Sequence, residues 1–220
     1  MAGTLEKMIG WLPALLEGLK ITLSLSVISV LVGLILSLFL ALGKMSKNKI
    51  IQRLSGAYIF FFRGTPLLMQ LYFVYYALPQ INPAFTIKSR FIAAFIAFAL
   101  NSAAYQAEII RAAIQSIDKG QFEAARALGM SHAQTMRLII IPQSYRRLIP
   151  PVGNEFIMVI KDTSLVSTIA LVDLMKRTSQ IQSSASTALV YIPAMIMYLL
   201  VTAVFTYVFN YLEKKFSVYE

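Results

Sequence analysis

Four polar residues stand inside stretches of sequence that are otherwise apolar enough to cross a membrane. Glu155 and Asp162 are seven residues apart, which places them on nearly the same face of a helix. Asn101 and Ser102 lie near the middle of another apolar stretch. A charge at the centre of a membrane helix costs about 2.5 to 3.5 kcal/mol, so each carboxylate needs a reason to be there. We expect two facing helices to line a polar cavity in which Glu155 binds a cationic group.

The same region also has structural interpretations, which the sequence leaves open. Lys161 and Asp162 could neutralise their neighbours or lie at a membrane interface. Asn101 could bond a neighbouring helix as readily as a ligand. Glu108 and Arg111 have the i,i+3 spacing of an ion pair at the inner end of a helix.

Five apolar runs organise the chain, each close to the length of about 20 residues that spans a bilayer. Their approximate bounds are Ile21–Gly43, Ser55–Leu78, Arg90–Ile114, Arg147–Val172 and Ala188–Leu212. The fourth run is the weakest because it contains charged residues. Together the five predict an all-α integral membrane protein with one domain over residues 1–220, rather than a set of soluble core helices.

Two features qualify the first two runs. Arg63 interrupts the second run near its start, and we expect it to hold the inner end of that span through carbonyl groups or a carboxylate. Gly64 and Pro66 would shape a break there. Ahead of the first run, Met1–Lys20 carries four charges and lacks the clean apolar core of a signal peptide. Its apolar residues recur at helical spacing, which predicts an interfacial amphipathic helix at the amino terminus.

The composition supports the membrane class. Hydrophobic residues make up 58% of the chain and charged residues only 14%, far from the soluble average. A net charge of +10 would suit nucleic acid only if the basic residues formed one face, but they are scattered at the ends of the apolar runs. With no cysteine and a single histidine, His132, the chain lacks the residues for a thiolate or histidine metal site.

The distribution of basic residues predicts the orientation. With the amino terminus outside, the inner segments hold twelve of them: Lys44, Lys47, Lys49, Arg53, Arg111, Lys119, Arg126, Arg137, Arg146, Arg147, Lys214 and Lys215. The outer segments hold six: Lys7, Lys20, Lys88, Arg90, Lys176 and Arg177. We therefore expect an outer amino terminus and a cytoplasmic carboxyl terminus.

A soluble-looking helix–turn–helix at about residues 118–142 separates the third run from the fourth. Glu123 is expected in the first turn of a short helix, where a carboxylate complements the positive end of the helix dipole. Gly129 can take the left-handed conformation that closes this helix. Ser131 and the glutamine three residues later fit a capping box, so a second helix should begin there and stop before Pro142.

Small residues would let another protein approach this segment closely. Ala124, Ala125 and Ala127 present almost no side chain, although an ordinary capped surface loop would have the same local features. A resemblance to a known family favours the contact surface over the ordinary loop. Glu123-Ala124-Ala125, then Gly129 after three intervening residues, then an Ile-x-x-Pro ending at Pro142, resemble the cytoplasmic coupling loop of ATP-binding-cassette importer permeases. Ile141 departs from the family pattern, which has leucine there, but the exchange is apolar.

Three further blocks resemble the polar amino acid branch of that family: Phe62–Leu68, Tyr105–Arg111 and Lys161–Leu165. The resemblance extends from about residue 18 to residue 212. It implies five transmembrane helices, the interfacial helix and a cytoplasmic coupling helix, in the plasma (inner) membrane of a bacterium. It also implies a two-fold dimer, with an identical copy or a homologue, and a path along the axis.

The resemblance also implies partners and sites. A cytoplasmic ATPase subunit, which uses ATP and magnesium, would bind the coupling residues Glu123, Ala124, Ala125, Leu128 and Gly129. An extracytoplasmic amino-acid-binding protein would deliver substrate to the outer loops near Pro79–Ile87 and Asp173–Ser186. Substrate binding is expected at Glu155, Asn101, Ser102 and Asp162. A basic amino acid adds a second cation, which Glu155 would suit.

The chain itself carries no phosphate-binding loop. Gly43-Lys44 is followed by Met45 rather than serine or threonine, and no glycine stands five residues before Gly43. Nucleotide hydrolysis is therefore expected in the partner, and this chain is not expected to be an enzyme. An ATP-independent secondary transporter or channel for small polar solutes is the alternative, but it leaves the cytoplasmic loop unexplained. An intramembrane enzyme is disfavoured because the only histidine lies in that loop.

Overall fold

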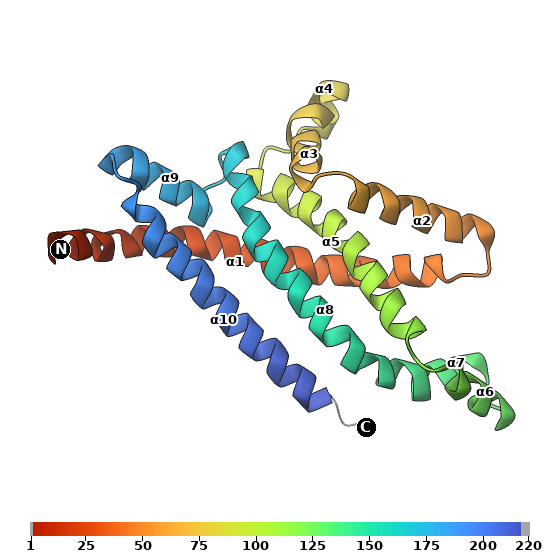
Figure 1. Cartoon of the computed structure of the whole chain (residues 1–220). Coiled ribbons are helices and arrows are strands. Elements are labelled where there is room, and N and C mark those ends of the chain that lie inside the picture. Colours follow the sequence, from red (N-terminus) through yellow and green to blue (C-terminus); the bar gives the residue numbers. More distant parts are fainter. Residues whose placement is uncertain (1, 217–220) are drawn as a thin grey trace.

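The computed structural model describes residues 2–216, and within that range the regular secondary structure is entirely helical (Figure 1). Four long helices form the body: α1 (Ala2–Lys44), α5 (Arg90–Gln115), α8 (Ile141–Asp162) and α10 (Tyr191–Phe216). Helix α8 packs against both α5 and α10, and α1 crosses this layer with its most extensive contacts to α5. The predicted all-α fold is confirmed.

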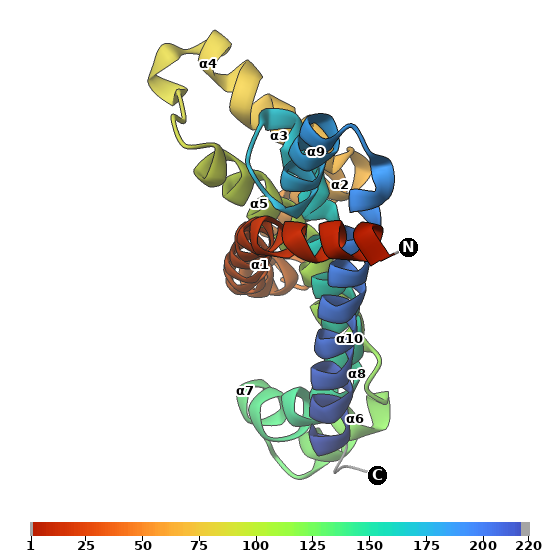
Figure 2. The same cartoon turned by 90° about the vertical axis from the view of Figure 1, so that its left-hand side faces the viewer.

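Helix α1 joins two elements that the sequence analysis separated. It is continuous from Ala2 to Lys44, so no break separates the predicted amino-terminal helix from the first span. Neither a proline nor a capping sequence falls between Glu17 and Ile21, and the helical hydrogen bonding therefore continues through the junction. Figure 2 shows that the amino-terminal part runs in a different direction from the rest of the helix.

The second apolar run is a broken helix. Helix α2 (Lys49–Gly64) meets the segment Leu67–Ile81 at an angle of 102°. Pro66 has no N–H and keeps Thr65 in an extended conformation, with φ −117° and ψ 144°, which ends α2. The predicted break is confirmed. The segment after the break contains α3 (Leu67–Tyr72), a π-helical turn (Phe73–Ala77) and α4 (Leu78–Ile81), and a short 3-10 turn (Pro83–Phe85) follows.

The coupling segment contains α6 (Lys119–Ala127) and α7 (His132–Thr135). Helix α7 continues through a π-helical turn (Met136–Ile140) into α8, so the expected stop before Pro142 is wrong. Pro142 lies in the first turn of α8, where a missing N–H is tolerated, and the wider π turn accommodates the change in hydrogen bonding.

The fourth predicted run is α-helical only in part. Helix α8 ends at Asp162, and a 3-10 helix (Thr163–Ile169) follows before Ala170 takes a left-handed conformation with φ 58°. The chain then forms α9 (Leu174–Ala185), a short 3-10 turn (Ala188–Val190) and α10. The expectation of one span from Arg147 to Val172 is therefore corrected to a helix with a differently wound end.

By length and composition, three helices within residues 2–216 could cross a membrane, and the broken second run would make a fourth. The three are Thr4–Lys44, Arg90–Gln115 and Ala188–Phe216. Helix α8 does not meet the same criterion because it carries five charged residues: Arg146, Arg147, Glu155, Lys161 and Asp162. The structure is therefore that of a helical membrane protein with several candidate spans.

The two ends of the molecule differ in what they present. Helices α6 and α7 and the carboxyl-terminal end of α10 gather at one end, whereas α4 and α9 lie at the other (Figures 1 and 2). The coupling segment and the carboxyl-terminal end of α10 thus lie at the same end of the molecule.

Candidate functional site

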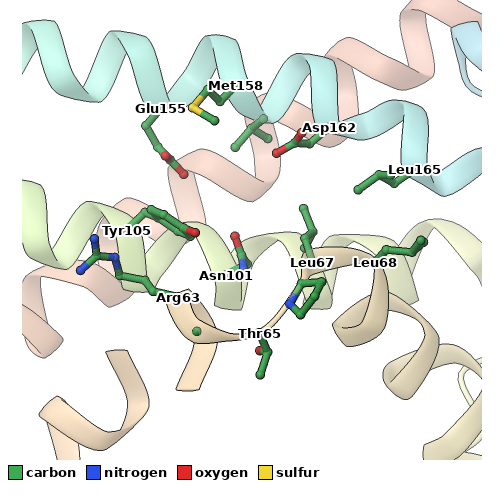
Figure 3. Close-up of a pocket in the computed structure, with 13 residues that line it drawn as sticks. Arg63, Thr65, Leu67, Leu68, Asn101, Tyr105, Glu155, Met158, Asp162 and Leu165 are labelled. Atoms are coloured by element: carbon green, nitrogen blue, oxygen red, sulfur yellow. The ribbon is translucent and has the colours of Figure 1, made fainter. Parts of the chain in front are cut away.

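A polar cavity of about 490 Å³ lies where the broken second span faces α5 and α8 (Figure 3). Helix α8 contributes Glu155 and Asp162, α5 contributes Asn101 and Tyr105, and the end of α2 contributes Arg63. Because α2 stops at the break, its last side chains and the extended backbone reach the cavity together. Three segments that are distant in sequence therefore surround one space.

Glu155 and Asp162 both line this cavity, as their spacing predicts. Figure 3 shows both carboxylates on the side of α8 that faces α5 and the break. Within residues 2–216, neither carboxylate has a basic side chain within ion-pair distance. Lys161 is exposed and does not line the cavity. Both carboxylates are therefore available to a cationic ligand.

Ser102 supports Glu155 and does not itself line the cavity. It is buried, and its Oγ donates a hydrogen bond to Glu155 Oε1 at 3.4 Å. Gln106 Nε2 donates in turn to Ser102 Oγ at 2.8 Å and to the carbonyl of Val30 at 3.1 Å. Of the four residues expected to bind substrate, Asn101, Glu155 and Asp162 line the cavity, whereas Ser102 contacts Glu155.

Asn101 lines the cavity, and its amide also holds the helix break together. Its Nδ2 donates to the carbonyl of Phe62 and to Gln70 Oε1, both at 3.0 Å. Gln70 Nε2 donates to the same Phe62 carbonyl at 2.9 Å and to the Thr65 carbonyl at 3.1 Å. Carbonyl groups freed where α2 ends are thereby satisfied within the protein, as they must be at membrane depth. The bond to a neighbouring helix, one of the two interpretations left open, is present.

Arg63 lies beside α5 at the edge of the cavity. Its guanidinium carbon is 5.3 Å from the centre of the Tyr105 ring, and its Nη1 is 3.9 Å from Glu108 Oε2. Glu108 is bound more closely by Lys44 and Arg111, each at 2.6 Å, and the predicted i,i+3 pair is confirmed. Arg63 thus reaches a carboxylate, as expected, but only at the limit of ion-pair distance.

The caps of the coupling segment form largely as predicted. Gly129 takes the left-handed conformation with φ 74°. The Ser131 hydroxyl accepts a hydrogen bond from the N–H of Gln134, whose side chain accepts one from the N–H of Ser131. Helix α6 begins after Asp118, so Glu123 lies in its second turn. The expected contribution of Glu123 in the first turn is therefore wrong.

Four of the five predicted coupling residues in and after α6 are exposed. Of the predicted coupling residues, Ala125 is buried. Glu123, Ala124 and Gly129 are exposed, and Leu128 is 80% exposed. These four residues form the surface that a cytoplasmic partner could contact.

Sequence reasoning missed the residues that support the pocket. Gln106 follows Ser102 by four residues and therefore lies on the same face of α5, a spacing that could have been noticed. Tyr105 and Gln106 lie in the Tyr105–Arg111 block, whose resemblance to the family does not give a role to each of its residues. Gln70 gave no such signal, because its partners become neighbours only through the break.

A helical fold with several candidate spans and a polar cavity between its helices is the arrangement expected of a membrane component of a transport system. The family of binding-protein-dependent transport system inner membrane components matches residues 33–218, and the chain belongs to this family. It is a multi-pass protein of the inner membrane, and permease subunits of this family have no ATPase activity of their own.

Similarity to individual relatives indicates the branch of the family to which the chain is related. The L-cystine transport system permease protein TcyB of Bacillus subtilis (strain 168) is 38% identical over 209 residues, which are 94% of this chain and 88% of TcyB. The arginine transport system permease protein ArtQ of the same organism is 41% identical over 206 residues, 93% of each chain. These relatives confirm the predicted resemblance to permease subunits of ATP-binding-cassette importers in the polar amino acid branch.

Solved structures agree with this assignment. The crystal structure of an amino acid ABC transporter with histidines contains a chain that is 41% identical, with a TM-score of 0.89, and the match covers 95% of this chain and 97% of that one. The MetNI methionine ABC transporter in an inward-facing conformation is 18% identical with a TM-score of 0.79, a likeness of fold alone.

Proposed function

We propose that this chain forms the translocation path of an ATP-driven importer whose substrate is a polar amino acid with a cationic side chain. The observation that carries the proposal is the pair of carboxylates, Glu155 and Asp162, in one cavity at membrane depth. The names of the relatives include arginine, glutamine and L-cystine and so leave the charge of the substrate open. The acidic lining favours a cation.

Electrostatics gives the reason for this preference. A carboxylate at membrane depth is costly unless a positive group accompanies it. Arg63 supplies one positive charge against the two carboxylates, so the polar cavity is short of one cation. A basic amino acid carries a net charge of +1 and would neutralise the site, whereas a neutral zwitterion would not. Binding of the basic substrate would thus neutralise the net negative charge of the cavity.

A separate cytoplasmic ATPase, which binds ATP and magnesium, would supply the energy. It would contact the exposed surface of α6 formed by Glu123, Ala124, Leu128 and Gly129, which lies at the same end of the molecule as the carboxyl terminus. Because α7 passes without interruption into α8, a movement of the coupling segment would be transmitted directly to the helix that carries both carboxylates.

The remaining assembly follows the same proposal. A second permease, identical or homologous, would complete the path. Each copy would cross the membrane five times, with α8 as the fourth crossing and the amino terminus outside. An extracytoplasmic amino-acid-binding protein would dock on the outer segments near Pro79–Ile87 and on α9. Residues 1–220 would form a single permease domain, with the coupling loop at about 118–142.

Uptake by the reconstituted transporter tests the choice of substrate. Permease, ATPase and binding protein are incorporated into liposomes, and the initial uptake of labelled arginine, lysine, glutamine and histidine is measured. Glu155→Gln should reduce arginine and lysine uptake by at least tenfold and glutamine uptake by much less. Glu6→Gln, which removes an exposed carboxylate at the amino-terminal end of α1, is the matched control. An equal loss for basic and neutral substrates would show that Glu155 does not select for charge.

The same liposomes discriminate between ATP-driven import and the ATP-independent alternative. With an ATPase subunit that binds but cannot hydrolyse ATP, accumulation against a gradient should disappear. Persistent accumulation driven by an ion gradient would instead support a secondary transporter.

A further inference from the structure

Arg63 borders two cavities. It lines the polar cavity with Glu155, and it also lines a second cavity of about 480 Å³ on the side toward the coupling segment. Tyr105 is likewise shared by both, whereas Arg111 and Arg147 line only the second. Figure 3 shows Arg63 and Tyr105 next to one another at the end of the polar cavity nearest Glu155. The guanidinium therefore stands at the junction of the two spaces.

The guanidinium of Arg63 has unused hydrogen-bonding capacity. An arginine side chain carries five N–H donors in a planar fork. Within residues 2–216, the short-range contacts of this group are the face of the Tyr105 ring and a 3.9 Å approach to Glu108, and neither is a hydrogen bond. Its charge also acts on Glu155, beyond ion-pair distance. The carboxylate of Glu108 is already engaged by Lys44 and Arg111 at 2.6 Å. Glu108 is therefore a poor permanent partner for Arg63.

A purely structural role for Arg63 does not account for this arrangement. The carbonyl groups freed at the end of α2 are those that an arginine at this position could bind, and the structure assigns them to other donors. The amides of Gln70 and Asn101 bind the Phe62 carbonyl, and Gln70 also binds the Thr65 carbonyl. The break is thus held together without the guanidinium, which lies at the edge of the cavity beside Tyr105.

We propose that Arg63 binds the α-carboxylate of the transported amino acid. This inference rests on the proposed function, since it takes the substrate to be an α-amino acid. The planar guanidinium fork matches a carboxylate in a two-point hydrogen-bonded pair. Glu155 and Asp162 stand across the cavity on α8 and would face the cationic groups of the same molecule. The two opposing walls thus separate the recognition of the backbone carboxylate from that of the side chain.

The position of Arg63 adds a consequence for the path. Since the same side chain borders the second cavity, a substrate bound through its carboxylate is held at the entrance to that cavity. Arg111, Arg147 and Glu108 line the wall beyond, and Arg111 is already bound to Glu108 at 2.6 Å. Arg147 is therefore the basic side chain that a carboxylate leaving Arg63 in this direction would meet.

Matched pairs of amino acids and decarboxylated amines test this proposal. Binding is measured by equilibrium dialysis with the purified permease–ATPase complex, without a binding protein whose own selectivity would interfere. The pairs are arginine and agmatine, histidine and histamine, and glutamine and 4-aminobutanamide. One charge-assisted pair corresponds to a preference of about tenfold to one-hundredfold for the amino acid. Wild type should show this preference, and Arg63→Gln should bring the ratio to about one without weakening amine binding.

Two further variants keep the test decisive. Arg63→Lys keeps the charge but loses the planar fork, so it should give an intermediate ratio and serves if the glutamine variant cannot be purified. Arg53→Gln removes an exposed arginine from the same helix, away from both cavities, and should keep the wild-type ratio. An undiminished ratio in both Arg63 variants would overturn the proposal.

The outcomes for the two proposals are distinct. If glutamine binds as tightly as arginine, the preference for a cationic side chain fails, while the effect of Arg63 is still read from the glutamine pair. If arginine binds best but the Arg63 variants keep the wild-type ratio, only the carboxylate assignment fails. A wild-type complex that binds no amino acid better than its amine contradicts the carboxylate assignment directly.

Discussion

Gln106 and Val30 connect the two most extensively packed helices of the protein through a hydrogen bond of 3.1 Å from the glutamine Nε2 to the valine carbonyl. The same Nε2 donates to Ser102, which donates to Glu155. The position of a carboxylate on α8 thus depends on the packing of α1 against α5, neither of which carries that residue.

This chain of bonds predicts an effect of Ser102 on substrate affinity. Ser102→Ala removes the hydrogen bond to Glu155 and leaves the carboxylate in place but less well oriented. Since such a bond contributes about 0.5 to 1.5 kcal/mol, the KM for uptake of a basic amino acid should rise by roughly threefold to tenfold. Ser24→Ala, at an exposed serine of α1, should change nothing. An unaltered KM in the Ser102 variant would mean that the bond does not orient the site.

The contact between α1 and α9 predicts a loss of stability. A Cβ added at Gly18 would lie 2.7 Å from the carbonyl oxygen of Asp173, closer than such atoms approach. Gly18→Val should therefore force the two helices apart and destabilise the protein by about 1 to 3 kcal/mol, seen as a lower Tm in detergent. Gly10→Val lies on the same helix, where nothing comes within 4 Å, and is the control. Equal Tm values for the two variants would show that α1 and α9 can move apart at Gly18 without loss of stability.

Asp173 makes the stability dependent on pH. It lies outside the candidate spans, where burial raises its pKa from 3.8 to about 6 despite the backbone hydrogen bonds from Met175 and Lys176. A carboxyl that binds its proton more tightly when folded stabilises the protein below pH 4, and this stabilisation is lost as the pH rises through 6. The difference of about two pKa units corresponds to about 3 kcal/mol.

The measurement compares wild type with Asp173→Asn, which keeps a side chain able to cap α9. Wild type should gain Tm relative to the variant as the pH falls from 8 to 4.5. Lys176 and Tyr198 are the other charged or titratable groups acting on Asp173, and both are retained in the variant. A constant difference in Tm over this range would show that Asp173 titrates normally.

Gly129 provides a test of coupling. Its φ of 74° suits glycine, and a β-branched residue would be strained there by roughly 1 to 2 kcal/mol. No atom lies within 4 Å of an added Cβ, so Gly129→Val should insert and fold but present a distorted end of α6. Substrate-stimulated ATP hydrolysis of the reconstituted complex should fall, while ATP hydrolysis by the isolated ATPase is unaffected. Normal stimulation would remove this turn from the coupling mechanism.

Local patterns account for the features that were predicted correctly. The capping box at Ser131, the left-handed Gly129 and the ion pair of Glu108 with Arg111 each depend on residues within four positions of one another. The break at Pro66 likewise follows from a missing N–H and the steric restriction of the preceding residue. Hydropathy located the apolar helices, because the length that spans a bilayer is set by its thickness.

The mispredicted features depend on how the helices wind and pack, which the local sequence pattern does not encode. Pro142 was expected to stop a helix, but a π turn carries the chain through it into α8. Ala125 is as small as its exposed neighbour Ala124, yet Ala125 is buried. The continuity of α1 also could not be read from charge, since four charged residues near an amino terminus fit a separate surface helix equally well.

The sequence by itself determined that the chain is a helical membrane protein of this permease family, with two carboxylates on one face of a helix. These properties follow from hydropathy, helical periodicity and ordered motifs. Only the tertiary structure decided that Ser102 contacts Glu155 and that Arg63 lines the same cavity as Glu155. Such relationships depend on how a helix break turns one segment toward two others, and no spacing along the chain encodes the distance between residues on different helices.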